Sequence, residues 1–482
     1  MSSPSFFGKN GLLTVLILAI TVFLSFWCFQ TNPASWFDEG IYLQMAKNIT
    51  SSGVWGVQTA PGVFTDYALI SVGYPVFLPA VAAFKIFGAN IAVLRFVAIL
   101  FLLGFVLVFY FLSRKLYGAK LALFSTLLLA TFSPLYGIGK NFLGEVPGLF
   151  FFVAGLLLLA FSEKAVRKSY PLIIFSGFFL GMAASAKPIF LLILPALAVA
   201  FLLNWRKYLL AKEGRIFTAA LGSGVFLALA AWVFTQFGGG TSLERVWAHY
   251  SNPYYVSDFT PVILSNLKRF FTESTPFHLL VLFLVSVWFF TKRFRKGEEM
   301  AVSEIAAWAF ASLVLLAYFR TAGWYKNFFP GHVLFFLFLA PGIESFLESF
   351  SLKKFLGAVI FLAVVIQLIP LWQENSWCRE DAPTAFEPYL KTIPADKSVF
   401  FLTVPQIAAR FDGANFYQYL KMSDYLKMGE ENLERMRRGE FDFIFAPQGV
   451  LEELSKIPAC YEFQNNISKI LIYQKNPASA CR

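Results

Sequence analysis

Apolar residues in this chain occur in long runs that are separated by shorter polar segments. The first run is Gly11–Phe29, and the others are Asn90–Leu112, Ala119–Tyr136, Val146–Phe161, Pro171–Ala186, Pro188–Leu203, Ile216–Phe237, Pro276–Phe290, Val302–Phe319, Phe328–Leu347 and Phe355–Leu371. A bilayer core of roughly 30 Å requires about 20 apolar helical residues to cross it. The pattern therefore predicts a polytopic α-helical membrane protein with about eleven transmembrane helices.

The orientation of these helices follows from one short apolar segment and from the basic residues. Val76–Phe87 is short for a span, so we expect a re-entrant or interfacial helix within the loop 30–89. Every second connection then carries a basic cluster, namely those around Arg114, Lys164, Arg206, Lys292 and Lys353. Because such clusters stay in the cytoplasm during insertion, the amino terminus is predicted to be cytoplasmic and the carboxyl terminus extracytoplasmic, in a plasma or inner membrane.

Composition agrees with a membrane protein, since 57% of the 482 residues are hydrophobic and only 14% are charged. The net charge of +11 comes from the basic loops, which anionic lipid can attract. It therefore does not indicate a nucleic-acid partner. The chain has three histidines and no CxxC or His/Cys metal spacing. We therefore expect no cofactor, and nothing in the sequence indicates a divalent metal.

The last part of the chain has a different character, because its charge is mixed and nearly balanced. Short buried strands are predicted at Ser398–Val404, Phe441–Ala446 and Ile467–Tyr473, and a helical stretch at Asn415–Met428. Residues 1–371 are therefore assigned to the transmembrane domain and 372–482 to an extracytoplasmic α/β domain.

The four cysteines leave the disulfide pattern open. Cys28 lies near the outer end of the first span, and Cys378, Cys460 and Cys481 lie in the tail. An oxidising compartment permits one disulfide, for which Cys460 with Cys481 is a reasonable pair because a predicted strand separates them. Free thiols are the alternative.

The clearest candidate chemistry lies directly after the first span, at Trp36-Phe37-Asp38-Glu39-Gly40. Ile41, Tyr42, Met45, Ala46 and Ile49 follow at helical spacing on one face, which predicts an amphipathic helix on the membrane surface. Asp38 and Glu39 begin this helix, where acidic side chains also serve as caps and complement the helix dipole. From spacing alone, the capping role is the more frequent one.

The segment from Asp38 to Asn48, placed just after the first span, resembles the opening motif of the GT-C glycosyltransferases, and of family 39 in particular. That family includes protein O-mannosyltransferases and lipid A aminoarabinose transferases. Three later features are similar as well: Gly73-Tyr74-Pro75, Glu145-Val146-Pro147 and Ala184-Ser185-Ala186-Lys187-Pro188. The likeness covers roughly Gly11–Leu371, and the tail agrees only in being an outer α/β domain.

The resemblance implies an inverting transfer of a hexose or pentose from a polyprenyl-phosphate-linked donor at the cell envelope. Asp38 would be the general base, and Glu39 and Tyr42 would support or bind the substrate. Lys187, alone between two apolar spans, is the first candidate for the leaving phosphate, with snorkelling to headgroups as its alternative. Arg320, Lys326 and His332 form a second predicted cationic group near Trp324-Tyr325, with interfacial anchoring as the alternative. Glu145 would position sugar or acceptor, unless it pairs with Lys140; Lys140 and Arg95 are weaker phosphate candidates.

Substrate identity stays open because the sequence departs from the known branches. The aminoarabinose branch usually has a Lys-Pro-Pro-like segment before the second span, whereas this chain has Ile70-Ser-Val-Gly-Tyr74-Pro75. The acceptor is therefore a glycan, a lipid or a protein. A flippase for a lipid-linked sugar is the alternative function, although no inverted repeat or pair of interrupted helices supports it.

Cysteine labelling of intact cells tests the predicted orientation. A cysteine placed within Gly413–Ser423 is expected to react with a membrane-impermeant reagent, and one placed near Arg295 to be protected, because these positions lie on opposite sides of the membrane. The reverse pattern would place Asp38 in the cytoplasm and contradict the predicted site.

Overall fold

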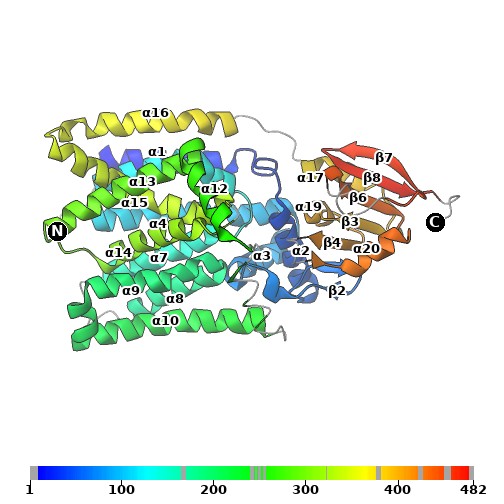
Figure 1. Cartoon of the computed structure of the whole chain (residues 1–482), viewed down its shortest axis with the longest axis horizontal. Helices are drawn as coiled ribbons and strands as arrows, with labels where there is room; N and C mark the ends of the chain where they lie inside the picture. The colour runs from blue at the N-terminus through cyan, green and yellow to red at the C-terminus, as the bar shows by residue number, and fades with distance from the viewer. Residues whose placement is uncertain are drawn as a thin grey trace.

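A computed structural model describes residues 9–163, 170–238, 257–321, 323–375, 382–421, 427–449 and 457–476, together with 244, 247, 251 and 252. A bundle of long helices and a tail domain built on a β-sheet lie end to end along the long axis of the molecule (Figure 1). The helices of the bundle are α1 (Lys9–Phe26), α4 (Ile91–Tyr117), α5 (Ala119–Ala130), α6 (Ser133–Gly139), α7 (Glu145–Ser162), α8 (Tyr170–Ala186), α9 (Ile193–Leu203), α10 (Lys212–Phe237), α12 (Phe259–Thr272), α13 (Ser274–Arg295), α14 (Val302–Tyr318), α15 (Tyr325–Ser349) and α16 (Leu356–Asn375). Between bundle and sheet lie α2 (Phe37–Ser52), α3 (Tyr74–Phe87) and the small hairpin of β1 (Gln58–Ala60) and β2 (Val63–Phe64).

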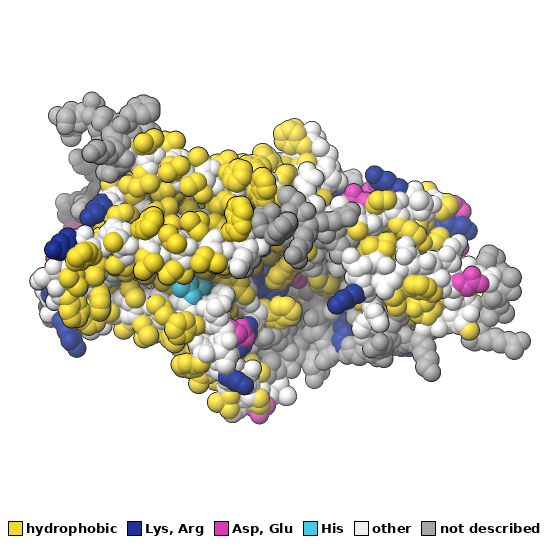
Figure 2. Space-filling model, turned by 90° about the horizontal axis from the view of Figure 1, so that it is seen from above, with side chains coloured by type: hydrophobic (Ala, Val, Ile, Leu, Met, Phe, Trp, Pro, Cys, Tyr) yellow, Lys and Arg dark blue, Asp and Glu magenta, His cyan; other side chains and the backbone are white. Residues whose placement is uncertain are grey.

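Several helices of the bundle have the length and the apolarity of membrane spans. Within the described part of the chain, six qualify by both criteria: Ile91–Tyr117, Glu145–Ser162, Lys212–Phe237, Ser274–Arg295, Tyr325–Ser349 and Lys353–Gln373. The shorter apolar helices are Gly11–Phe26, Tyr74–Phe87, Tyr170–Ala186, Pro188–Leu203 and Val302–Tyr318. Each predicted span overlaps one or two helices, and hydrophobic side chains predominate on the described part of the bundle face in Figure 2. The number of helices that cross the membrane remains a prediction.

One predicted span is not a straight helix. The segment expected at Ala119–Tyr136 consists of α5 and α6, which meet at a bend of 65°. The break precedes Pro134, the second residue of α6, which has no backbone N–H to continue the helical hydrogen bonds of α5. The bend directs the chain after α6 toward α2.

The tail domain is organised around a sheet with the strand order β5-β4-β3-β6-β8-β7. Its strands are β3 (Val399–Leu402), β4 (Phe416–Lys421), β5 (Lys427–Met428), β6 (Phe443–Pro447), β7 (Tyr461–Ile467) and β8 (Ile470–Lys475), and its helices are α17 (Ala382–Ala385), α18 (Glu387–Leu390), α19 (Pro405–Ala408) and α20 (Glu430–Arg437). β3 is parallel to β4 and β6, and the remaining pairs are antiparallel. Phe401 and Phe400 point into separate apolar clusters on the two faces, so the central strand is buried on both sides.

The predicted strands at Ser398–Val404 and Phe441–Ala446 are confirmed. The predicted strand Ile467–Tyr473 is wrong in its extent, because a turn at Ser468 and Lys469, both with positive φ, divides it between β7 and β8. The predicted helix at Asn415–Met428 is also wrong. Its described residues form β4 and β5, because parallel pairing with the buried strand β3 outweighs the local helical pattern.

Both cysteines that the structure describes are in disulfide bonds. Cys28 and Cys460 are both disulfide-bonded, so neither is a free thiol. Cys378 and Cys481 lie outside the described residues. The predicted pairing of Cys460 with Cys481 therefore stays a prediction.

Helix α2 is held between the bundle and the tail, and it does not lie on a membrane surface as predicted. All residues from Glu39 to Ala46 are buried. The polar face of α2 contacts the tail: Gln44 donates to the carbonyl of Pro405 at 3.1 Å and to Gln418 at 3.1 Å. Gly40 allows this approach, since a Cβ there would overlap the backbone of Gln406.

The substitution Gly40→Ala tests this close contact. We expect the added methyl group to push α19 away and to destabilise the folded protein by roughly 1–3 kcal/mol. Thermal unfolding in detergent and proteolytic release of the tail are the measurements. Gly222→Ala in α10 is the control, because a Cβ there meets open space; equal unfolding temperatures for the two variants would contradict the contact.

Candidate functional site

Five side chains from distant parts of the chain meet at the end of the bundle that faces the tail. Asp38 and Tyr42 come from the first turns of α2, and Glu145 is the first residue of α7. Lys187 lies between α8 and the short helical turn Pro188–Leu192, and Lys326 is the second residue of α15. All five were predicted as site residues from the sequence.

Two ion pairs lie side by side in this cluster. The ammonium group of Lys326 donates a hydrogen bond to Oδ2 of Asp38 in a direct ion pair. Nζ of Lys187 is 3.3 Å from Oε1 of Glu145 and 5.9 Å from the centre of the Tyr42 ring. Each of the four charged side chains is at most 18% exposed, so their charges act on one another with little screening by water.

The electrostatics of the cluster favour its charged state. Burial would raise the pKa of Asp38, but the positive charges of Lys326 and Lys187 outweigh burial and bring that pKa below its usual value. Burial would lower the pKa of Lys187, but the carboxylate of Glu145 and the neighbouring Tyr42 and Asp38 raise it above its usual value. Both shifts favour the charged forms, the carboxylate of Asp38 and the ammonium group of Lys187.

Local sequence explains how Glu145 and Lys187 meet. Lys187 has an extended backbone, as expected for a residue that precedes proline. A Cβ on Gly144 would lie 2.7 Å from the carbonyl oxygen of Ala186 and 3.0 Å from Cδ of Lys187, so glycine permits this approach. Among the described residues, the second carboxylate oxygen of Glu145 is buried and has no hydrogen-bond partner.

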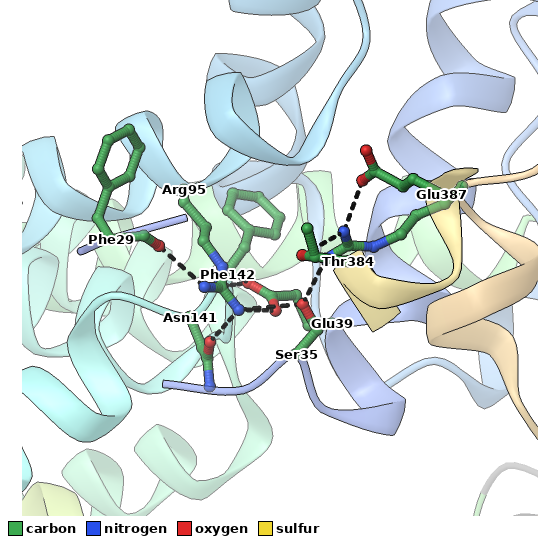
Figure 3. A network of polar contacts seen from close by, with 9 residues as sticks. Phe29, Ser35, Glu39, Arg95, Asn141, Phe142, Thr384 and Glu387 are labelled. Carbon is green, nitrogen blue, oxygen red and sulfur yellow. Dashed lines mark hydrogen bonds and ion pairs between the residues drawn. The ribbon is translucent and has the colours of Figure 1, made fainter. Parts of the chain in front are cut away.

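Glu39, the neighbour of Asp38 in the sequence, forms a buried ion pair of its own. It forms a bidentate ion pair with Arg95, at 2.9 Å and 2.7 Å, and both side chains are fully buried. Arg95 also donates to the carbonyl of Phe29 at 2.8 Å and to Asn141 at 2.9 Å (Figure 3). Arg95 was a weak phosphate candidate from the sequence, but its guanidinium group is occupied by these contacts, which attach α2 to the bundle.

The tail extends this network through Ser35. The hydroxyl oxygen of Ser35 accepts from Arg95 at 3.1 Å and from Arg410 at 3.0 Å. Arg410 in turn pairs with Glu387 at 2.6 Å and donates to Thr384 at 2.8 Å. Sequence reasoning missed Arg410 and Ser35, because nothing in the local pattern around either residue indicates a partner so far away in the chain.

Other predicted residues lie apart from the cluster. The guanidinium of Arg320 is exposed and stacks on the ring of Phe259 at 4.4 Å. His332 is buried and forms a hydrogen bond with His278 at 2.9 Å between their rings. Arg320, Lys326 and His332 therefore do not form the single cationic group that was expected, because α15 places only Lys326 toward α2.

Lys140 has no ion pair with Glu145, which was the alternative partner. Its ammonium group donates to the carbonyl of Trp27 at 2.8 Å. Burial, together with the nearby charge of Arg95, lowers the pKa of Lys140 to about 8. Metal ligation has no candidate in the parts of the chain that the structure describes, where no three histidine, cysteine or acidic residues converge.

Comparison with known proteins identifies the fold. The family model for dolichyl-phosphate-mannose-protein mannosyltransferases matches residues 75–234. The structure is similar to ArnT from Cupriavidus metallidurans bound to undecaprenyl phosphate, with a TM-score of 0.66 and 10% identity over 98% of this chain and 99% of that one. It is also similar to the oligosaccharyltransferase AglB from Archaeoglobus fulgidus in complex with an inhibitory peptide and a dolichol-phosphate, with a TM-score of 0.60 and 12% identity over 93% of this chain and 70% of that one. No curated protein matches the chain in sequence.

The substitution Lys326→Met tests the electrostatic account of Asp38. We expect the pKa of Asp38 to rise, because burial then acts with one fewer opposing charge. In the native protein the carboxylate stays charged as the pH falls to its lowered pKa, and the stability that the ion pair contributes is lost only through that range. Carboxylate titration by NMR of labelled aspartate is the measurement. Arg320→Met, outside the cluster, is the control, and an equal titration of both variants would contradict the pairing.

Proposed function

We propose that this chain, which has the fold of the GT-C glycosyltransferase superfamily, transfers a sugar from a polyprenyl-phosphate-linked donor to an acceptor on the extracytoplasmic side of the membrane. The observation that carries the proposal is the position of the Asp38 carboxylate beside Lys326 and Lys187 at the tail-facing end of the bundle. A proton acceptor and two phosphate-binding charges are the groups that such a transfer requires.

The lysines have the chemistry to stabilise the leaving group. When the bond between the sugar and the phosphate breaks, negative charge develops on the phosphate oxygens. Two ammonium groups with little exposure to water would stabilise that charge strongly, because they are already oriented and are poorly screened. Lys187 and Lys326 are therefore the proposed phosphate ligands, and Lys187 keeps Glu145 as its fixed partner.

Asp38 is the proposed general base for an inverting transfer. The acceptor hydroxyl must attack the sugar on the side opposite to the phosphate, and a carboxylate accepts the proton of that hydroxyl. Donor phosphate at Lys326 would compete with Asp38 for the ammonium group. Release of Asp38 from this pair raises its pKa, because burial favours the neutral carboxyl, and makes it a stronger base when the donor is present.

Glu145 and Tyr42 are the proposed contacts to the sugar or the acceptor. The buried, unpartnered oxygen of Glu145 can accept a hydrogen bond from a hydroxyl group. The hydroxyl of Tyr42 lies 3.4 Å from Ser71, at the side of the cluster next to Lys187. Glu39 acts indirectly, because its pair with Arg95 holds the first turn of α2 in place.

The substitution Asp38→Asn tests the proposal. Asparagine has the same size but does not accept the proton, so transfer is expected to fall by about 10²–10⁴-fold while donor binding persists. The measurement is product formation by mass spectrometry, with purified protein, polyprenyl-phosphate sugars and candidate acceptors. Asp258→Asn is the matched control: Asp258 caps α12 through the N–H of Thr260, at 2.8 Å, and asparagine caps equally well.

Normal turnover of the Asp38→Asn variant would contradict the role of general base. A second experiment distinguishes the transferase from the alternative function, a flippase. If native protein in vesicles moves a lipid-linked sugar between leaflets and forms no glycosylated product with any acceptor, the chain is a flippase and the transferase proposal is wrong.

A further inference from the structure

A pocket of about 480 Å³ lies between the bundle and the tail. Helix α2 contributes Leu43 and Lys47 to its wall, and the tail contributes Arg410 and Phe411. The turn before α4, at Ala89–Ile91, closes it on the side of the bundle. Apolar and charged side chains therefore line the same pocket.

The pocket lies at the boundary of the apolar bundle. Helix α4 is long and apolar enough to span the membrane, and it begins at Ile91 in the pocket wall. The end of a span coincides with the level of the lipid headgroups. The pocket therefore opens where the headgroups of the leaflet on the tail side would lie.

Positive charge is in excess in this pocket. Arg410 is paired with Glu387 at 2.6 Å, whereas Lys47 is 3.8 Å from Asp412, whose side chain is 87% exposed. Lys47 also donates a hydrogen bond to the carbonyl of Ala409 at 2.8 Å, and burial lowers the pKa of Lys47. The side chain of Lys391 has no ion-pair partner among the described residues. An anionic group would satisfy both lysines.

We propose that this pocket is a separate binding site for a phosphate-bearing amphiphile, namely an anionic phospholipid of the leaflet on the tail side. The phosphate contacts Lys47 and Lys391, and the upper part of the acyl chains packs on Leu43 and Ile91. An amphiphile fits the wall better than a free anion does, because the lining is partly apolar and opens at the membrane boundary.

The site is distinct from the cluster around Asp38. Lys47 lies nine residues after Asp38 on α2, which places the two side chains about 180° apart around the helix. Arg410 joins the two sites, because it lines the pocket and also donates to Ser35, whose oxygen accepts from Arg95. A bound lipid would thereby stabilise the first turn of α2. This effect on transfer rests on the proposed function, whereas the binding itself does not.

Lipid retention by the purified full-length protein tests the site. Native mass spectrometry would compare phosphatidylglycerol with phosphatidylcholine, which differ in net headgroup charge. One lysine near an anionic surface contributes roughly a fivefold factor in binding, so Lys391→Ala and Lys47→Ala are each expected to weaken retention of phosphatidylglycerol by about that factor. Lys427→Ala is the matched control, because Lys427 lies on β5 outside the pocket.

Equal retention of the two lipids, or equal retention by the pocket variants and the control, would overturn the site. If millimolar inorganic phosphate displaces phosphatidylglycerol, the ligand of the pocket is a soluble anion, and the proposal of an amphiphile is wrong. If phosphatidylglycerol binds as expected but changes the transfer rate equally in native protein and in Lys391→Ala, the coupling to α2 is wrong and the binding site stands. If the native protein shows no sugar transfer at all, the proposed function is wrong, but lipid retention still tests the binding site. The two proposals can therefore fail independently.

Discussion

The buried ion pair between Glu39 and Arg95 is the interaction on which the site geometry depends. Taking two charges out of water is costly unless each finds its full set of partners. Arg95 meets this condition with contacts to the end of α1, to Ser35 and to the chain before α7, and Glu39 also accepts from the backbone N–H of Phe142 at 3.1 Å. Removal of one partner from such a pair typically costs about 3–5 kcal/mol. The pair therefore fixes the residue next to Asp38 with respect to three helices at once.

The tail domain completes this arrangement from the other side. A polar helix face with Gln44 is stable in a buried position only where other polar groups satisfy it. The tail supplies them through Pro405 and Gln418, and it adds Arg410 to the network at Ser35. Helix α2 is thus held by buried hydrogen bonds on the tail side and by a buried ion pair on the bundle side, which limits the movement of Asp38.

The two ion pairs of the candidate site stabilise its charges and also act on the pKa of Asp38. Lys187 and Glu145 neutralise one another, and so do Lys326 and Asp38, so the partly buried charges are tolerated. Both pairs are also close enough that each lysine affects the pKa of Asp38. A phosphate that engages the lysines would therefore change the basicity of Asp38 without any movement of the backbone, which links donor binding to proton transfer in the proposed reaction.

The sequence by itself determined the features that depend on neighbours in the chain. Long apolar runs predicted the helices of the bundle, continuous buried runs predicted β3 and β6, and the motif around the acidic pair predicted the fold that the similar structures share. Lys187 stood out because a charge between two apolar runs requires a partner. Only the tertiary structure decided which partner that was. Glu145 forms its ion pair with Lys187, whereas Lys140 donates to a backbone carbonyl. Asp38 pairs with Lys326, and neither Arg320 nor His332 belongs to that cluster. Helix α2, predicted on the membrane surface, is buried from Glu39 to Ala46. The reason is that the sequence indicates which buried charged side chains require an opposite charge, but several residues could supply it. Only the packing of the helices determines which of them lies within a few ångströms.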